Sequence, residues 1–218
     1  MTSRRVWLFD LDNTLHDANP HIFPAMSRAM LDYVAEKVGV GETAAKALRD
    51  EYWQRYGATM TGLVRHHGVD PHDFLARTHD FLDDLPRMVV FEPALRHALE
   101  RLPGRKILFS NAPRHYVEAI LDHVGIRRLF DSIWTIERLR LTPKPHLAAF
   151  RRLLRDERLQ AQRCIFVEDS AANLRAAKQL GMKTVLVSPA VRAPAYVDVL
   201  IKSALDLPRL GLTQGQRG

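Results

Sequence analysis

Two carboxylates stand two residues apart in the segment Phe9-Asp10-Leu11-Asp12-Asn13-Thr14, directly after a short apolar run. In an extended chain, side chains at this spacing point to the same side, so Asp10 and Asp12 would share one environment. Carboxylates that share a site raise each other's pKa, and a divalent cation relieves the repulsion while leaving one oxygen as a nucleophile. Taken alone, the segment is equally compatible with an acidic turn that caps a helix.

Further polar groups follow other apolar runs of the chain. They are Ser110 and Asn111 after residues 106–109, Lys144 between two prolines, and Glu168 and Asp169 after residues 164–167. In a parallel sheet the carboxyl ends of the strands face one crevice. There a hydroxyl with nearby backbone N–H groups suits a phosphate oxygen, a lysine supplies positive charge, and carboxylates complete an oxygen-ligand magnesium site. Their joint occurrence favours one such site over separate roles in turns, loops and caps.

The elements that must position these groups follow from the apolar pattern. Apolar runs without polar alternation lie at residues 6–9, 106–109, 133–136, 164–167 and 184–187. Such runs are typical of parallel strands buried on both faces. Helical stretches lie between the later runs, at residues 115–124, 146–155 and 171–180. The alternation predicts an α/β protein with a doubly wound, Rossmann-like parallel sheet.

The segment between the first two runs is almost wholly helical in its periodicity. The periodic stretches are residues 22–38, 43–56, 59–67 and 71–85, and Asp70-Pro71 suits the start of the last one. We therefore predict a helical cap domain, residues 17–87, inserted after the first strand of a catalytic core formed by residues 1–16 and 88–218. The tail after Leu212 is low in complexity, and we expect it to be frayed.

Composition restricts the class of protein. The chain has 218 residues, 46% of them hydrophobic and 26% charged, and its single cysteine excludes a disulfide framework or a cysteine-based zinc site. The formal charge of +7 comes from scattered arginine-rich patches, which favours a solvated surface over nucleic-acid binding. No apolar run approaches the roughly 18 to 20 residues of a membrane span. We expect a cytoplasmic monomer or weak homodimer that binds a small anionic molecule, with no nucleic-acid or membrane partner.

The four motifs resemble, in order and spacing, those of the haloacid dehalogenase superfamily. The segment from Asp10 to Thr14 is similar to the first motif, Ser110-Asn111 to the second, Lys144 to the third, and Glu168-Asp169-Ser170 to the fourth. The resemblance implies that Asp10 is the nucleophile that takes a phosphoryl group and that Asp12 is the general acid and then the general base. The founding dehalogenases expel halide, which needs no proton, and lack the second aspartate. The presence of Asp12 therefore argues for phosphate esters.

The same resemblance implies the phosphate and metal ligands. The expected phosphate-binding residues are Thr14, Ser110, Asn111 and Lys144, and the expected Mg²⁺ ligands are Asp10, the main-chain carbonyl of Asp12, and Asp169, with Glu168 as a direct or indirect partner. Glu168 is a departure, because the closer group named below usually has an aspartate there. Its role is left open.

The predicted cap resembles a narrower group, the pyrimidine 5′-nucleotidases, in residues 51–63 and His67. This implies that Tyr52, Tyr56, Thr59 and His67 contact substrate, although aromatic residues at helical spacing also suit a core. The expected function is a magnesium-dependent phosphomonoesterase that hydrolyses pyrimidine nucleoside 5′-monophosphates through an aspartyl-phosphate. Alternatives are a phosphatase for phosphoglycolate or a sugar phosphate, a phosphomutase, or a scaffold without activity; the last is disfavoured because all the catalytic motif residues are present.

Overall fold

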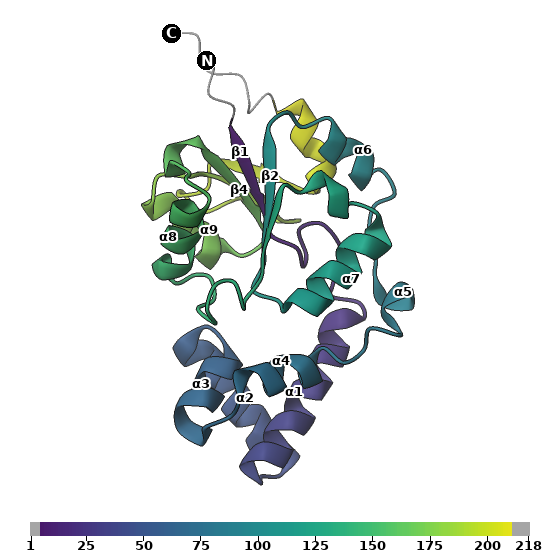
Figure 1. Cartoon of the computed structure of the whole chain (residues 1–218), viewed down its shortest axis with the longest axis vertical. Helices are drawn as coiled ribbons and strands as arrows, with labels where there is room; N and C mark the ends of the chain where they lie inside the picture. Colours follow the sequence, from purple (N-terminus) through teal and green to yellow (C-terminus); the bar gives the residue numbers. More distant parts are fainter. Residues whose placement is uncertain (1–4, 211–218) are drawn as a thin grey trace. The chain divides into compact units, whose positions relative to one another are not determined.

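The computed structural model describes residues 5–210, which form two compact units (Figure 1). One unit comprises the chain up to Asp17 and from Val90 onward, and the other is Ala18–Val89. The corresponding bounds expected from the sequence are residues 1–16 with 88–218, and residues 17–87. The tail after Leu212 lies outside the described residues.

The first unit is built on a parallel sheet, to which the described residues contribute six strands in the order β3-β2-β1-β4-β5-β6. The strands are β1 (Val6–Phe9), β2 (Arg105–Phe109), β3 (Ser132–Trp134), β4 (Cys164–Glu168), β5 (Lys183–Val187) and β6 (Val199–Ile201). From β1 the chain adds β2 and β3 on one side and β4 to β6 on the other, so β1 marks a topological switch point, where open α/β sheets bind their ligands. The predicted doubly wound sheet is confirmed.

Helices cover both faces of this sheet, which explains why its strands are apolar throughout. Figure 1 shows α8 (Leu147–Asp156) and α9 (Ala171–Gln179) on one side and α6 (Leu95–Glu100) and α7 (Arg114–Val124) on the other. On the α8 and α9 side, the rings of Phe109, Phe150 and Phe166 pack together within a buried cluster. Short 3₁₀ helices complete the unit: η1 (Arg127–Leu129), η2 (Ala161–Arg163) and η3 (Ala204–Arg209).

The second unit is helical. Its helices are α1 (Ile22–Val38), α2 (Glu42–Tyr56), α3 (Thr59–His67), α4 (Pro71–Thr78) and α5 (Leu85–Met88). The ring of Tyr52 on α2 packs directly on Gly62 of α3, where an added Cβ would lie 2.1 Å from the Tyr52 Cγ. Gly62 therefore sets how closely α2 and α3 can approach.

The single helix predicted over residues 71–85 is wrong, because α4 ends at Thr78 and α5 begins only at Leu85. The Thr78 hydroxyl donates to the Phe74 carbonyl at 2.7 Å, and Nδ1 of His79 lies 3.0 Å from the Leu75 carbonyl. These side chains compete for the carbonyls of the last helical turn and favour its termination.

Among the described residues, no helix combines the length and apolar character that a membrane crossing requires.

Candidate active site

The predicted polar residues meet at the carboxyl ends of β1, β2 and β4, around Lys144. The Lys144 side chain is 1% exposed, and its Nζ donates to Asp10 Oδ1 at 2.7 Å, to Glu168 Oε2 at 2.8 Å and to the Phe109 carbonyl at 2.7 Å. An ammonium group has three N–H donors, so each is matched by one acceptor. Lys144 thus joins the ends of three strands.

Asn111 holds the loop that carries Lys144. The Asn111 Oδ1 accepts the backbone N–H of Lys144 at 2.8 Å, and its Nδ2 donates to the Lys144 carbonyl at 3.0 Å. Both ends of the amide therefore contact the main chain of Lys144. A phosphate contact by the Asn111 side chain stays a prediction.

The carboxylates around Lys144 carry more negative charge than one ammonium neutralises. Oxygens from Asp10, Glu168 and Asp169 all lie within 4.8 Å of one another. Burial raises the pKa of Asp10 to about 7, and the charges of Glu168 and Asp12 add to this while Lys144 opposes it. Burial likewise raises the pKa of Glu168 to about 7 and shifts the pKa of Asp169 upward.

Burial acts on the ammonium in the opposite sense, because it disfavours the charged form of each group. Burial alone would lower the pKa of Lys144, but the neighbouring charges of Asp10 and Glu168 outweigh it and leave this pKa above its ordinary value. Lys144 therefore stays charged. The remaining negative charge, carried on hard oxygen donors, fits a Mg²⁺ ion.

Glu168 has donors on both of its oxygens. Its Oε2 accepts from Lys144 and, at 3.0 Å, from Nδ2 of Asn173 on the first turn of α9, and its Oε1 accepts the backbone N–H of Ser170 at 3.1 Å. The carboxylate is thus held in place from two sides. Asn173 thus braces the loop that carries Glu168.

The two hydroxyl groups predicted to bind phosphate belong to Thr14, in the loop after β1, and to Ser110, directly after β2. Thr14 Oγ1 donates to Asp10 Oδ2 at 3.3 Å. The Ser110 Oγ, in a residue that is 1% exposed, accepts the backbone N–H of Ala112 at 3.0 Å, which leaves its hydroxyl proton for another acceptor. Phosphate binding by Thr14 and Ser110 stays a prediction.

Asp12 has neighbours that the sequence analysis did not select. Its Oδ1 lies 2.9 Å from Nε2 of His16 and accepts the hydroxyl of Tyr116 at 2.5 Å. His16 follows Asp12 by four residues, and this spacing was the one available signal. Tyr116 lies 104 residues away in the sequence, on the buried face of α7, and looks like an ordinary core residue.

In the second unit, the predicted substrate residues form hydrogen bonds between α2 and α3. The Tyr52 hydroxyl pairs with Nε2 of His67 at 2.7 Å, the Tyr56 hydroxyl pairs with Nε2 of His66 at 2.6 Å, and the Thr59 hydroxyl donates to the Arg49 carbonyl at 3.2 Å. Tyr52 and Thr59 are buried, Tyr56 is half-buried and His67 is exposed. Substrate contact by these four residues stays a prediction.

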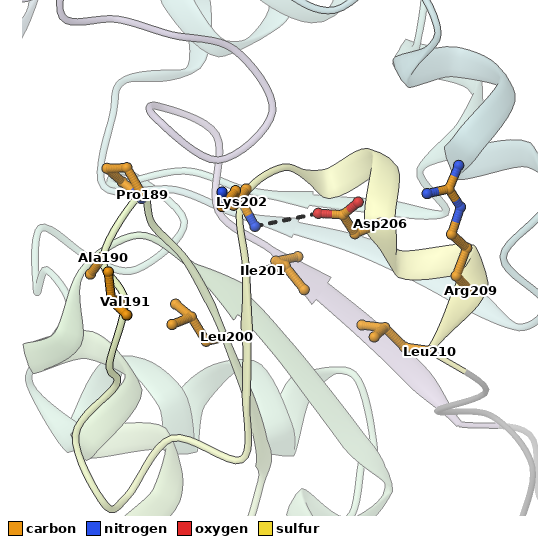
Figure 2. A pocket seen from close by; sticks show the side chains of 9 residues that line it. All are labelled: Pro189, Ala190, Val191, Leu200, Ile201, Lys202, Asp206, Arg209 and Leu210. Carbon is orange, nitrogen blue, oxygen red and sulfur yellow. Dashed lines mark hydrogen bonds between the residues drawn. The ribbon is translucent and has the colours of Figure 1, made fainter.

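A groove of about 570 Å³ lies at the β6 edge of the first unit (Figure 2). Val191, Leu200, Lys202 and Arg209 are among its lining residues, with Lys202 at the end of β6 and Arg209 on η3. None of the residues predicted to bind phosphate or metal lines this groove. The acidic site around Lys144 is therefore distinct from it.

Comparison with known proteins agrees with the motif pattern, since residues 7–187 match the model of the haloacid dehalogenase-like hydrolases. The chain belongs to this family. Phosphate metabolism protein 8 of Saccharomyces cerevisiae is 26% identical over 201 residues, covering 84% of this chain and 61% of that protein. A phosphoglycolate phosphatase of Pseudomonas fluorescens is 30% identical over 199 residues, covering 84% of this chain and 69% of that protein. The chain thus spans only about three fifths of the length of the yeast protein.

Solved structures of the superfamily have the same fold. An HAD phosphatase from Thermococcus onnurineus aligns with a TM-score of 0.69 and 18% identity, covering 96% of this chain and 99% of that one. The L-2-haloacid dehalogenase from Xanthobacter autotrophicus aligns with a TM-score of 0.63 and 16% identity, covering 98% and 100%. At such low identity the likeness shows the fold, which both phosphatases and dehalogenases of this superfamily share.

Proposed function

We propose that this protein is a magnesium-dependent phosphomonoesterase whose nucleophile is Asp10. The observation that carries the proposal is the buried cluster at the switch point, in which one ammonium, Lys144, faces Asp10 and two further carboxylates. Phosphoryl transfer requires mainly positioning and neutralisation of charge. A lysine and a metal-binding set of carboxylates around one nucleophile supply both.

The proposed reaction has two balanced steps. First, an Asp10 oxygen attacks phosphorus, and the bond from phosphorus to the ester oxygen breaks as Asp12 donates a proton to that oxygen. Second, water attacks the phosphorus of the aspartyl-phosphate, Asp12 takes a proton from the water, and the bond between Asp10 and phosphorus breaks. The products are the alcohol and inorganic phosphate.

The other site residues hold the reacting groups. Thr14 and Ser110 bind phosphate oxygens. Lys144 exchanges one of its present acceptors for a phosphate oxygen when substrate binds, and Asn111 positions Lys144. Asp10, the main-chain carbonyl of Asp12, and Asp169 would hold Mg²⁺, which when bound supplies charge neutralisation to the transferring phosphoryl group. We assign Glu168 an indirect role, in which its contact with Lys144 orients the ammonium and its hydrogen bonds with Ser170 and Asn173 hold the carboxylate in place.

For the substrate we infer a pyrimidine nucleoside 5′-monophosphate. The second unit carries an aromatic cluster in which Tyr52 stacks on His66, and the guanidinium groups of Arg55 and Arg65 lie 5.4 and 5.8 Å from the Tyr56 ring centre. Flat rings and guanidinium groups suit a flat base. The competing candidate is phosphoglycolate, which is favoured by the name of the Pseudomonas relative. The cytoplasmic location and the monomeric or weakly dimeric state also remain predictions.

A panel of phosphomonoesters assayed with Mg²⁺ distinguishes these substrates. We expect UMP, CMP or dTMP to have a higher kcat/KM than AMP, GMP, phosphoglycolate or glucose 6-phosphate. Tyr56→Ala should raise KM for nucleotides and leave a small generic ester nearly unaffected. A tenfold preference for phosphoglycolate or a hexose phosphate, about 1.4 kcal/mol of discrimination, would exclude the nucleotidase function but keep the phosphatase function.

The chemistry itself is tested by Asp10→Asn. An amide oxygen is a poor nucleophile, so this variant should show no turnover and no phosphoenzyme, and it should not form a complex with the phosphate mimic beryllium trifluoride. Asp156→Asn, at an exposed acid of α8, is the matched control and should behave as wild type. Undiminished turnover in Asp10→Asn would refute the mechanism.

A further inference from the structure

The carboxylate of Asp12 is held by two residues that have no role in the proposed mechanism. Nε2 of His16 lies 2.9 Å from Asp12 Oδ1, and the hydroxyl of Tyr116 donates to the same oxygen at 2.5 Å. The residues His16 and Tyr116 are 4% and 0% exposed, whereas the Asp12 side chain is 18% exposed. His16 and Tyr116 therefore lie inside the core, and the Asp12 carboxylate that they contact reaches the surface of the unit.

The loop after β1 is shaped so that His16 returns to Asp12. The backbone N–H of Leu15 donates to the Leu11 carbonyl at 2.9 Å, and Asp12 and His16 form an isolated β-bridge. Leu11 and Leu15 are both buried and anchor this turn in the core. The contact between His16 and Asp12 is thus built into the loop backbone as well as the side chains.

The second ring nitrogen of His16 indicates which of the two nitrogens carries the proton. Among the described residues, Nδ1 of His16 is buried and has no hydrogen-bond partner. An N–H group in that position would be an unsatisfied buried donor, which is unfavourable. The neutral ring with its proton on Nε2 avoids this, because it donates to Asp12 and leaves only a lone pair on Nδ1.

We infer that His16 and Tyr116 are positioning residues that fix the Asp12 carboxylate through Oδ1. Two donors directed at Oδ1 keep this oxygen an acceptor. The inference rests on the proposed function, in which Asp12 is the general acid and base. Neither His16 nor Tyr116 is assigned a contact with the substrate.

Removal of the contacts that His16 and Tyr116 make with Asp12 should lower kcat/KM for an ester by an amount that depends on its leaving group. An alkyl ester needs a proton on its oxygen as the bond to phosphorus breaks, whereas p-nitrophenolate leaves without one. The constant kcat/KM covers the steps up to departure of the leaving group, so it excludes the later hydrolysis of the phosphoenzyme. The ratio of kcat/KM for the two esters therefore reports the acid role of Asp12.

The experiment compares p-nitrophenyl phosphate with the alkyl ester that the wild-type enzyme hydrolyses fastest. Tyr116→Phe and His16→Leu should each lower kcat/KM for the alkyl ester about 10-fold, and together about 100-fold, the scale of a small misplacement of a catalytic group. With p-nitrophenyl phosphate the change should stay within about threefold, as expected where no proton transfer is needed. His16→Gln, whose side-chain amide N–H reaches the position of Nε2, should recover most of the loss.

Asp12→Asn calibrates the measurement and supplies a double-mutant cycle. In an Asp12→Asn background, adding Tyr116→Phe should leave the ratio unchanged, because there is no acid left to position. Tyr116→Phe removes one oxygen atom, and thermal unfolding of each variant checks that the fold is kept. Equal losses for both esters, or no loss in either single variant, would overturn the positioning role. If the wild type hydrolysed neither ester, the proposed function itself would be overturned.

Discussion

Two clusters of charged side chains in the first unit, each centred on a buried side chain, are built in opposite ways. The Lys144 cluster, at the carboxyl ends of β1, β2 and β4, contains Lys144, Asp10, Glu168 and Asp169. The Glu157 cluster contains Glu157, Arg105, Arg138, Ser132 and Trp134. Arg105 and Ser132 are the first residues of β2 and β3, so this second cluster includes the amino ends of those strands.

The balance of charge separates the two clusters. The Glu157 side chain is 6% exposed, and it accepts from both guanidinium groups, from Ser132 at 2.6 Å and from Trp134 at 2.7 Å. Burial would raise the pKa of Glu157, but these hydrogen bonds outweigh it and lower the pKa. In the Lys144 cluster, by contrast, the pKa of Asp10 and that of Glu168 rise to about 7.

This difference distinguishes a structural cluster from one that suits the proposed reaction. A carboxylate that accepts enough hydrogen bonds and faces enough positive charge is stable as an anion without a bound cation. A carboxylate site with too few positive charges is stabilised by an added cation, and its nucleophile is kept close to a state in which it can react. By this criterion the Lys144 cluster, and not the Glu157 cluster, is the candidate active site.

The largest effect should come from removing the one ammonium of the Lys144 cluster. Lys144→Met should lower kcat/KM by roughly 10³-fold, since a single preorganised charge-stabilising donor is worth on the order of 10² to 10³ in rate. Steady-state kinetics with saturating Mg²⁺ measures this. Lys202→Met, at an exposed lysine, should change nothing, and an equally small effect of Lys144→Met would contradict a role in binding phosphate.

A smaller effect, on stability and not on rate, is expected in the Glu157 cluster. Glu157→Gln keeps the shape of the side chain but removes the charge that faces Arg105 and Arg138, and it should cost about 2 kcal/mol of the free energy of unfolding. Urea denaturation at pH 7 measures the loss, while kcat/KM should stay at the wild-type value. Glu118→Gln, which loses a surface ion pair with Arg114, should cost less than about 0.5 kcal/mol. If Glu157→Gln instead lost activity as Lys144→Met does, the contrast between the clusters would be wrong.

The smallest effect concerns the pH dependence of stability. The raised pKa values of Asp10 and Glu168, about 7 each, mean that between roughly pH 4 and 7 the folded protein retains protons that the unfolded chain has lost. Stability from these groups is therefore present at low pH and is lost as pH rises through this window. In a metal chelator, Tm should fall by a few degrees between pH 5.5 and 8.

Magnesium and a double variant sharpen this test. Mg²⁺ should raise Tm more at pH 8 than at pH 5.5, because ionised carboxylates bind the cation and protonated ones do not. The variant with both Asp10→Asn and Glu168→Gln should lose most of the pH slope and most of the stabilisation by Mg²⁺. A metal-free wild type whose Tm rises steadily over this range would contradict the raised pKa values.

Several features were predictable because they depend on local pattern. The apolar runs located β1, β2, β4 and β5, and helical periodicity located α1 and α3 with both ends correct. Short elements were missed, since β6 has three residues and α6 has six, too few for a clear period. The break after Thr78 was missed as well, because it depends on how Thr78 and His79 use nearby carbonyls.

The sequence by itself determined which polar groups the candidate site has and in what order they follow the strands. Asp10 and Asp12 were identifiable because two-residue spacing at a strand end is a local property, and Lys144 because its neighbours form a recognisable motif. The family followed from those motifs.

Only the tertiary structure decided how these groups are paired. It joined Lys144 to Asp10 across 134 residues and to Glu168 across 24, and it brought Tyr116 to Asp12 across 104. Hydrogen bonds depend on distance and direction in space, and a core tyrosine has the same local pattern whether or not its hydroxyl reaches a carboxylate. Which oxygen of Asp12 is held, and where carboxylates outnumber positive charges, therefore depends on how the folded segments come together.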